Sequence, residues 1–101
     1  MTAPSRGDDW NEAERGQICR LQDFCENMAH WTVESSRTDG GEPWCVIYDH
    51  WRRCVILRIA RIDLQYVTTW PPEQRGAKGT SMAVAVTTAL ARLKAYEPPG
   101  R

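Results

Sequence analysis

A run of consecutive residues near the middle of the chain combines the side chains that most often contact partners. With one nearby arginine, the group is Asp49, His50, Trp51, Arg52, Arg53 and Arg58. Tryptophan and arginine dominate the binding energy of many protein interfaces, and tryptophan also stacks on nucleic-acid bases. Because residues 49–53 lie between two strand-like runs, we expect them at the tip of a hairpin. An exposed Trp51 there would favour recognition of a partner.

A second group of residues has the composition of an anion-binding site. Two cations, two glycines and two hydroxyls precede a predicted helix, namely Arg75, Gly76, Lys78, Gly79, Thr80 and Ser81. The first amides of a helix are unpaired and its dipole is positive at that end, which favours a phosphate. The residue order of a P-loop is absent. A mobile polar loop that ends in a helix cap is the other interpretation.

Nucleophiles and metal ligands are present, but not in a catalytic or metal-binding spacing. The candidates are Cys19, Cys25, Cys45, Cys54, His30, His50, Ser35, Ser36 and Ser81. The cysteines form no paired CxxC knuckles, and no serine lies in a Gly-x-Ser-x-Gly elbow. Cys19 and Cys25 are separated by about 240° around a helix, so they do not share a face. We therefore expect reduced, buried thiols, no cofactor or metal, and no catalytic residues, although the residues do not exclude an enzyme.

The charge balance narrows the class of partner. Thirteen basic and thirteen acidic side chains cancel, so no long-range field attracts nucleic acid or anionic lipid. Nucleic-acid binding would require a local basic face. Its phosphate contacts would be Arg52, Arg53, Arg58, Arg61 and the segment 75–78, with Tyr48, Tyr66 or Trp70 as stacking platforms. This is the alternative to a protein partner.

Length and composition are those of one small globular domain. The chain has 101 residues, of which 42% are hydrophobic and 26% charged. We expect a single domain over 1–101, ordered from about 9 to 96, with tails at 1–7 and 97–101. The first residues lack the apolar core of a signal peptide, and no apolar run approaches the length of a membrane span. These features predict a cytoplasmic protein that does not enter a membrane.

Helical periodicity appears near both ends of the chain. Asp9 followed by Glu12 predicts a capping box, and a stripe of apolar residues follows at helical spacing. The members of that stripe are Ile18, Leu21, Cys25 and Met28, with Phe24 beside them. Thr80 or Ser81 would cap a second helix. Its apolar side is Met82, Val86, Ala89, Leu93 and Tyr96, with Arg92 and Lys94 near its negative end.

Between the helices, apolar and β-branched residues favour strands. The expected strands are 31–36, 44–48, 53–60 and 65–70, with the third in the centre and a loop at 73–79. The predicted fold is therefore α+β, a four-stranded antiparallel meander flanked by an N-terminal and a C-terminal helix, in the order α-β-β-β-β-α.

Arg58 predicts that one face of the sheet is not covered by helices. An unpaired guanidinium buried in a core would cost several kcal/mol. Strict alternation along 53–60 divides the side chains into two sets. We expect the core set to be Val55, Leu57 and Ile59, and the opposite set to be Cys54, Ile56, Arg58 and Ala60.

Residues 31–70 carry a resemblance to other proteins. The segments Gly41-Glu42-Pro43-Trp44, 55–63 and Tyr66-Val67 resemble a group of uncharacterised small alphaproteobacterial proteins. In that group, a Gly-x-Pro-Trp strand start precedes a segment reading His-Ile-Ala-Arg-Ile-Asp-Gly. This chain has Arg58 in place of the His and Leu64 in place of the final Gly. Because glycine permits the positive φ of a tight turn, Leu64 predicts another turn type or a longer loop. The resemblance supports a sheet and implies no function.

Taken together, the residues predict a non-catalytic protein-interaction module, such as an adaptor, regulator or inhibitor. It would bind a protein partner, or a second copy of itself, through a sheet edge or the Trp51 turn. A small nucleic-acid-binding protein is the alternative. A phosphate-ligand binder or enzyme at the Gly76–Ser81 loop ranks last.

Overall fold

The structure, a computed structural model, describes residues 10–71 and 75–95. In these ranges it contains two helices and five strands. They are α1 (Glu12–Cys25), β1 (Trp31–Arg37), β2 (Pro43–Asp49), β3 (Cys54–Ile62), β4 (Gln65–Trp70), β5 (Arg75–Gly79) and α2 (Met82–Ala95). The strands form one antiparallel sheet in the order β1-β2-β3-β4-β5, with β3 in the centre. The α+β meander is confirmed, but its strand count was one too low.

The additional strand, β5, replaces most of the predicted loop. Its sequence, Arg-Gly-Ala-Lys-Gly, has low intrinsic strand preference. It becomes a strand because it pairs along its whole length with β4, where Ala77 lies opposite Thr68 and Gly79 opposite Tyr66. At Gly76 the two backbones are close, since a Cβ there would lie 3.1 Å from the Thr68 carbonyl oxygen. Tertiary pairing therefore outweighs local preference in this segment.

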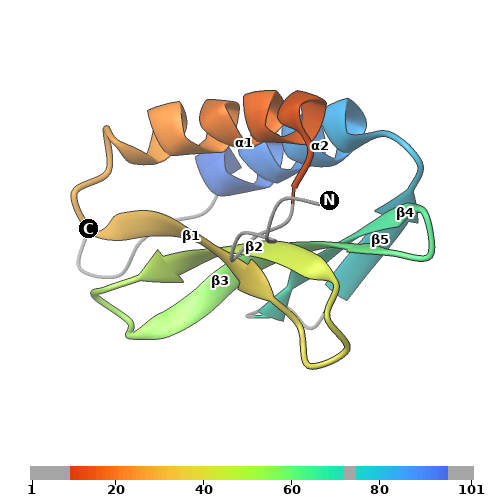
Figure 1. Cartoon of the computed structure of the whole chain (residues 1–101). Coiled ribbons are helices and arrows are strands. Elements are labelled where there is room, and N and C mark those ends of the chain that lie inside the picture. The colour runs from red at the N-terminus through yellow and green to blue at the C-terminus, as the bar shows by residue number, and fades with distance from the viewer. Residues whose placement is uncertain (1–9, 72–74, 96–101) are drawn as a thin grey trace.

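Both helices pack on the same face of the sheet (Figure 1). α1 lies against β1 and α2, and α2 lies against β4 and β5. The predicted stripes face inward and form the core with the central strands. Its fully buried members include Leu21, Val86, Ala89, Cys45, Ile47, Leu57 and Ile59. The core positions of both helices are confirmed, with Phe24 and Met28 partly buried. Tyr96 lies outside the described residues.

The helix starts differ from the predicted capping pattern. The cap of α1 is Asn11, whose Oδ1 accepts from the Glu14 backbone N–H at 2.7 Å. In return, the Asn11 N–H donates to Glu14 Oε1 at 2.9 Å. The proposed pairing of Asp9 with Glu12 is wrong, and Asp9 itself lies outside the described residues. At α2, Ser81 rather than Thr80 is the cap, because its Oγ accepts from the Val84 N–H at 3.2 Å.

Arg58 lies on the sheet face opposite the helices, as predicted. It is paired with Val46, on the half-buried side of a strand whose alternate residues are fully buried. The assignments of Val55 and Ile56 are wrong. Leu57 lies opposite Ile47 and Val55 lies opposite Tyr48, so Ile56 is an extra residue in a β-bulge. Ile56 therefore joins Leu57 in the core, and Val55 lies opposite Tyr48 with the uncovered side chains.

The turn between β3 and β4 has only two residues, Asp63 and Leu64, because Ile62 pairs with Gln65. Both turn residues have positive φ, 53° for Asp63 and 64° for Leu64. This is the type I′ pattern, which matches the twist of the flanking strands. The expectation of another turn type or a longer loop is wrong, because Leu64 adopts the left-handed conformation that glycine usually occupies.

Replacing Leu64 with Gly is expected to raise the free energy of unfolding by about 1 kcal/mol. A left-handed backbone costs a residue with a Cβ roughly 1–2 kcal/mol, which exceeds the entropy that glycine gains in the unfolded chain. No packing is lost, since Leu64 is 87% exposed. Urea unfolding measures the change. The variant L64A keeps the Cβ and should leave stability nearly unchanged; a less stable L64G would contradict the assignment of strain to this residue.

Candidate functional site

The turn between β2 and β3 is held by the carboxylate of Asp49. This residue is fully buried, and its Oδ1 accepts from the backbone N–H groups of Trp51 at 2.8 Å and Arg52 at 3.1 Å. The Arg53 N–H donates to the Asp49 carbonyl at 2.7 Å, with Arg53 at φ 58°. Asp49 therefore positions the turn. Its buried side chain does not offer a contact surface.

The indole of Trp51 is exposed but held in place. It is 59% exposed, and it stacks on the ring of His30 with centroids 3.7 Å apart and planes 8° from parallel. His30 is nearly buried, and its carbonyl accepts from the His50 N–H at 2.7 Å. One face of the indole thus contacts a fixed ring while much of the side chain meets solvent. An anchor that is already oriented loses little entropy on binding.

His50 links the turn to the uncovered side of the sheet. Its Nε2 lies 3.0 Å from the Thr32 hydroxyl, and its ring meets Tyr48 edge to face at 4.9 Å. Thr32 and Tyr48 face each other across β1 and β2 on the side away from the helices. The Trp51 turn and this side of the sheet therefore adjoin.

We call the sheet side opposite the helices the open face. Its positions on β2, β3 and β4 are largely apolar, unlike the polar outer face of most antiparallel sheets. The half-buried residues there are Trp44, Val46, Tyr48, Val55, Arg58 and Val67. The Arg58 guanidinium lies 5.0 Å from the centroid of the Trp44 ring, a cation–π distance. No described element covers this face (Figure 1).

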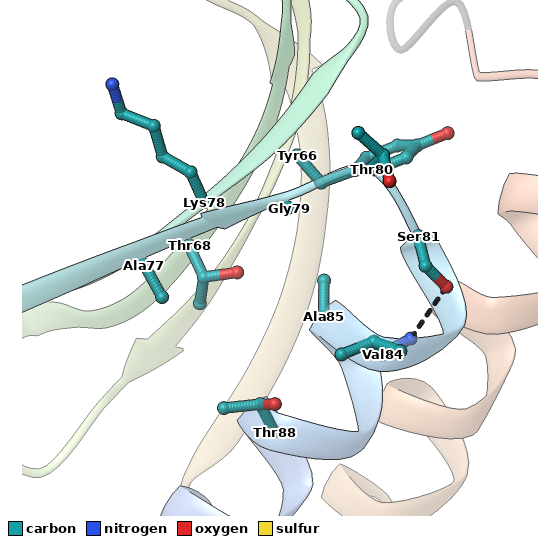
Figure 2. A pocket seen from close by; sticks show the side chains of 10 residues that line it. All are labelled: Tyr66, Thr68, Ala77, Lys78, Gly79, Thr80, Ser81, Val84, Ala85 and Thr88. Carbon is teal, nitrogen blue, oxygen red and sulfur yellow. Dashed lines mark hydrogen bonds between the residues drawn. The ribbon is translucent and has the colours of Figure 1, made fainter.

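The predicted anion-binding residues are not brought together. Lys78 pairs with Val67, and its side chain extends away from the start of α2 (Figure 2). Ser81 is engaged as the helix cap, and Arg75 begins β5. Gly79 and Thr80 border a pocket between β5 and α2 whose walls are mainly small side chains. The helix start and the lysine therefore point to different sides of the sheet.

Other residues proposed as nucleic-acid contacts also lie on separate faces. Trp70 is buried in the core. Arg61 and Tyr66 are paired across β3 and β4 on the helix side, where both bond to Glu14. Of the three proposed stacking platforms, Tyr48 alone lies on the open face.

The cluster of Glu14, Arg61 and Tyr66 was not found from the sequence. Glu14 is 2% exposed; its Oε1 accepts from Arg61 Nη1 at 2.5 Å and its Oε2 from the Tyr66 hydroxyl at 2.6 Å. Burial alone raises the pKa of Glu14, but bonds from Tyr66, Arg61 and Asn11 and the Arg61 charge outweigh it and hold that pKa below its ordinary value. Burial, with the Glu14 carboxylate, raises the pKa of Tyr66. The cluster ties α1 to β3 and β4.

The four cysteines are unpaired, as predicted, but two of them are not buried. Cys25 and Cys45 are core residues, and burial raises the pKa of their thiols to about 11 and about 12. Cys19 and Cys54 are exposed. Within residues 10–71 and 75–95, no three potential metal ligands lie close enough together to hold an ion.

Comparison of the chain with protein-family models, with curated proteins and with solved structures finds no match. Neither of the helices that the structure describes has the length and apolarity needed to cross a bilayer. The functional argument therefore rests on the open face, the Trp51 turn and the pocket beside α2.

Proposed function

We propose that this chain is a non-catalytic protein-interaction module that binds a protein partner with its Trp51 turn and the adjoining open face. The observation that carries the proposal is the Trp51 indole, 59% exposed yet stacked on His30. Large, oriented aromatic side chains beside a half-buried apolar surface are typical of interface centres. Arg52 and Arg53 are exposed neighbours of this anchor.

A protein partner fits this surface better than a nucleic acid does. The open face is mainly aliphatic, and Arg58 lies against Trp44, where it shields one ring. Arg61, Tyr66 and Trp70 belong to the helix side of the sheet. A nucleic-acid site requires several cations and stacking rings on one surface. We therefore favour protein recognition, with self-association as a second outcome to be measured.

Replacing Trp51 with Ala is expected to weaken partner binding at least about tenfold, because an aromatic anchor often contributes about 2 kcal/mol or more. Stability should change by no more than about 1 kcal/mol, since the lost contact is one exposed ring pair. Affinity capture from lysate of the encoding organism, followed by titration of the captured protein, measures the effect.

The matched control is Leu64→Ala, which removes another exposed apolar side chain at the other end of β3. Proteins that bind through the Trp51 surface should be retained by L64A and lost by W51A. Sedimentation of the purified chain tests self-association in parallel. A monomer whose captured proteins are the same for W51A, L64A and the unmodified chain would contradict the proposal.

A further inference from the structure

We propose that a second site, the groove between β5 and α2, binds an extended segment of another protein that alternates apolar and acidic residues. The segment would add to β5 as a further antiparallel strand. This site lies at the opposite edge of the sheet from β1, on the helix side, so it does not depend on the Trp51 surface.

The first argument is the free edge of β5. This strand pairs with β4 on one side, and no described residue pairs with it on the other. In an antiparallel strand, alternate residues direct their N–H and C=O groups away from the existing neighbour. Those groups can form a ladder with an added strand, the mode of recognition known as β-augmentation. Residues 76–79 of β5 are exposed, so the edge is accessible.

The second argument is the space beside that edge. A cavity of about 270 Å³ lies between β4, β5 and the first turns of α2. In Figure 2, Thr68 and Ala77 of the sheet and Ala85 and Thr88 of the helix border the same space. The side chains of β5 that face α2 are small, and they leave this volume unfilled.

A second, smaller cavity of about 60 Å³ continues along the same groove. It shares Thr68, Ala77 and Thr88 with the first cavity, and it extends to Trp70 and Arg92. Successive side chains of a strand alternate between the two sides of a sheet. The two cavities are therefore placed to receive alternate side chains of an added strand. Their volumes suit amino-acid side chains, since sites for small-molecule ligands usually measure roughly 300–1,000 Å³.

The third argument is charge. Although the whole chain has no net charge, residues 75–95 contain four basic residues and no Asp or Glu. The basic residues are Arg75, Lys78, Arg92 and Lys94. The Arg92 guanidinium lies 5.9 Å from the centroid of the Trp70 ring, at the smaller cavity. Charge complementarity favours an acidic segment and disfavours a basic one.

The test uses the full chain and fluorescein-labelled hexapeptides in which Val alternates with Glu or with Lys. The Glu peptide should bind at least about tenfold more tightly than the Lys peptide. N-methylation of alternate backbone amides in the Glu peptide should weaken binding by a similar factor, because it removes the ladder donors. Amide NMR signals of Gly76–Gly79, Val84 and Thr88 should shift when the Glu peptide is added.

Gly79→Val is the blocking variant. Gly79 lies opposite Tyr66 on the helix side, and an added Cβ there meets no atom within 4 Å, so the fold should be kept. The new side chain should fill the larger cavity and weaken the Glu peptide at least about tenfold. Thr69→Val, on the other face of β4, is the matched control and should bind as the unmodified chain does. W51A should also bind normally, which separates this site from the proposed function.

The proposal is overturned if the Glu peptide does not bind at millimolar concentration, if the Lys or N-methylated peptide binds as tightly, or if a folded G79V binds normally. A dimer in sedimentation that G79V abolishes and the Glu peptide does not dissociate would also overturn it. In that case the groove would belong to a second copy of the chain.

Discussion

Replacing Glu14 with Ala is expected to lower the free energy of unfolding by about 3 kcal/mol, one of the two largest effects among the substitutions considered. The carboxylate is nearly buried and accepts from Arg61, Tyr66 and the Asn11 backbone. Its removal leaves the buried end of this cluster without acceptors and breaks the reciprocal cap of α1, which alone contributes about 1 kcal/mol. Urea unfolding followed by circular dichroism measures the change.

Glu12→Ala is the matched control for this substitution. Glu12 is an exposed acid in the same first turn of α1, so its loss should cost only a few tenths of a kcal/mol through the helix dipole. Tyr66→Phe keeps the ring and removes one donor to Glu14, so we expect an intermediate loss of about 1 kcal/mol. Equal stabilities for E12A and E14A would contradict the role given to the cluster.

The same cluster makes stability depend on pH in a defined direction. Because the folded pKa of Glu14 is lower than its ordinary value of 4.5, the carboxylate stabilises the fold fully above that pH. This contribution is lost as the pH falls from 4.5 through the folded pKa. The stability difference between the unmodified chain and E14Q should therefore shrink below pH 4.5. A difference that grows in acid would show the opposite sign of shift.

Replacing Ile56 with Ala is the second substitution with a large expected effect, a loss of about 3 kcal/mol. Ile56 is fully buried because the bulge in β3 turns it toward the helices together with Leu57. Removing three methyl or methylene groups from a core of this kind usually costs roughly 2–5 kcal/mol. Leu57→Ala should cost a similar amount. Thermal and urea unfolding of both variants measure the effect.

Val55→Ala is the control, since Val55 is half-buried on the open face and should cost less than about 1 kcal/mol. An unbroken alternation along β3 would reverse this order, with Val55→Ala more damaging than Ile56→Ala. The ranking of these two variants therefore tests the bulge directly.

The bulge also marks how far the sequence could predict the fold. Apolar periodicity was enough to place both helices, the four longer strands and Arg58 on the uncovered face, because each signal is local. Alternation along β3 fails at Ile56, since an extra residue in one strand depends on the pairing with β2. β5 was missed for a related reason. Its glycines and charged residues have no strand preference, and its pairing with β4 supplies the structure.

The candidate site was predicted in part. The order of residues 49–53 was enough to place Trp51 at a hairpin tip, but not to show that Asp49 is buried or that His30 lies under the indole. The groove beside α2 depends on the edge position of β5. The Glu14 cluster joins residues 47 and 52 positions apart in the chain, a separation at which local patterns carry no information.

Site-specific photocross-linking tests the central claim most directly, by placing a benzophenone amino acid at position 51 and, in a second variant, at position 64. Both positions are exposed, and they lie at opposite ends of β3. We expect illumination of cells producing the position-51 variant to give a discrete covalent adduct with a partner protein, and the position-64 variant to give none. Equal labelling from both positions, or no adduct at position 51 in a correctly folded chain, would contradict a binding surface at the Trp51 turn.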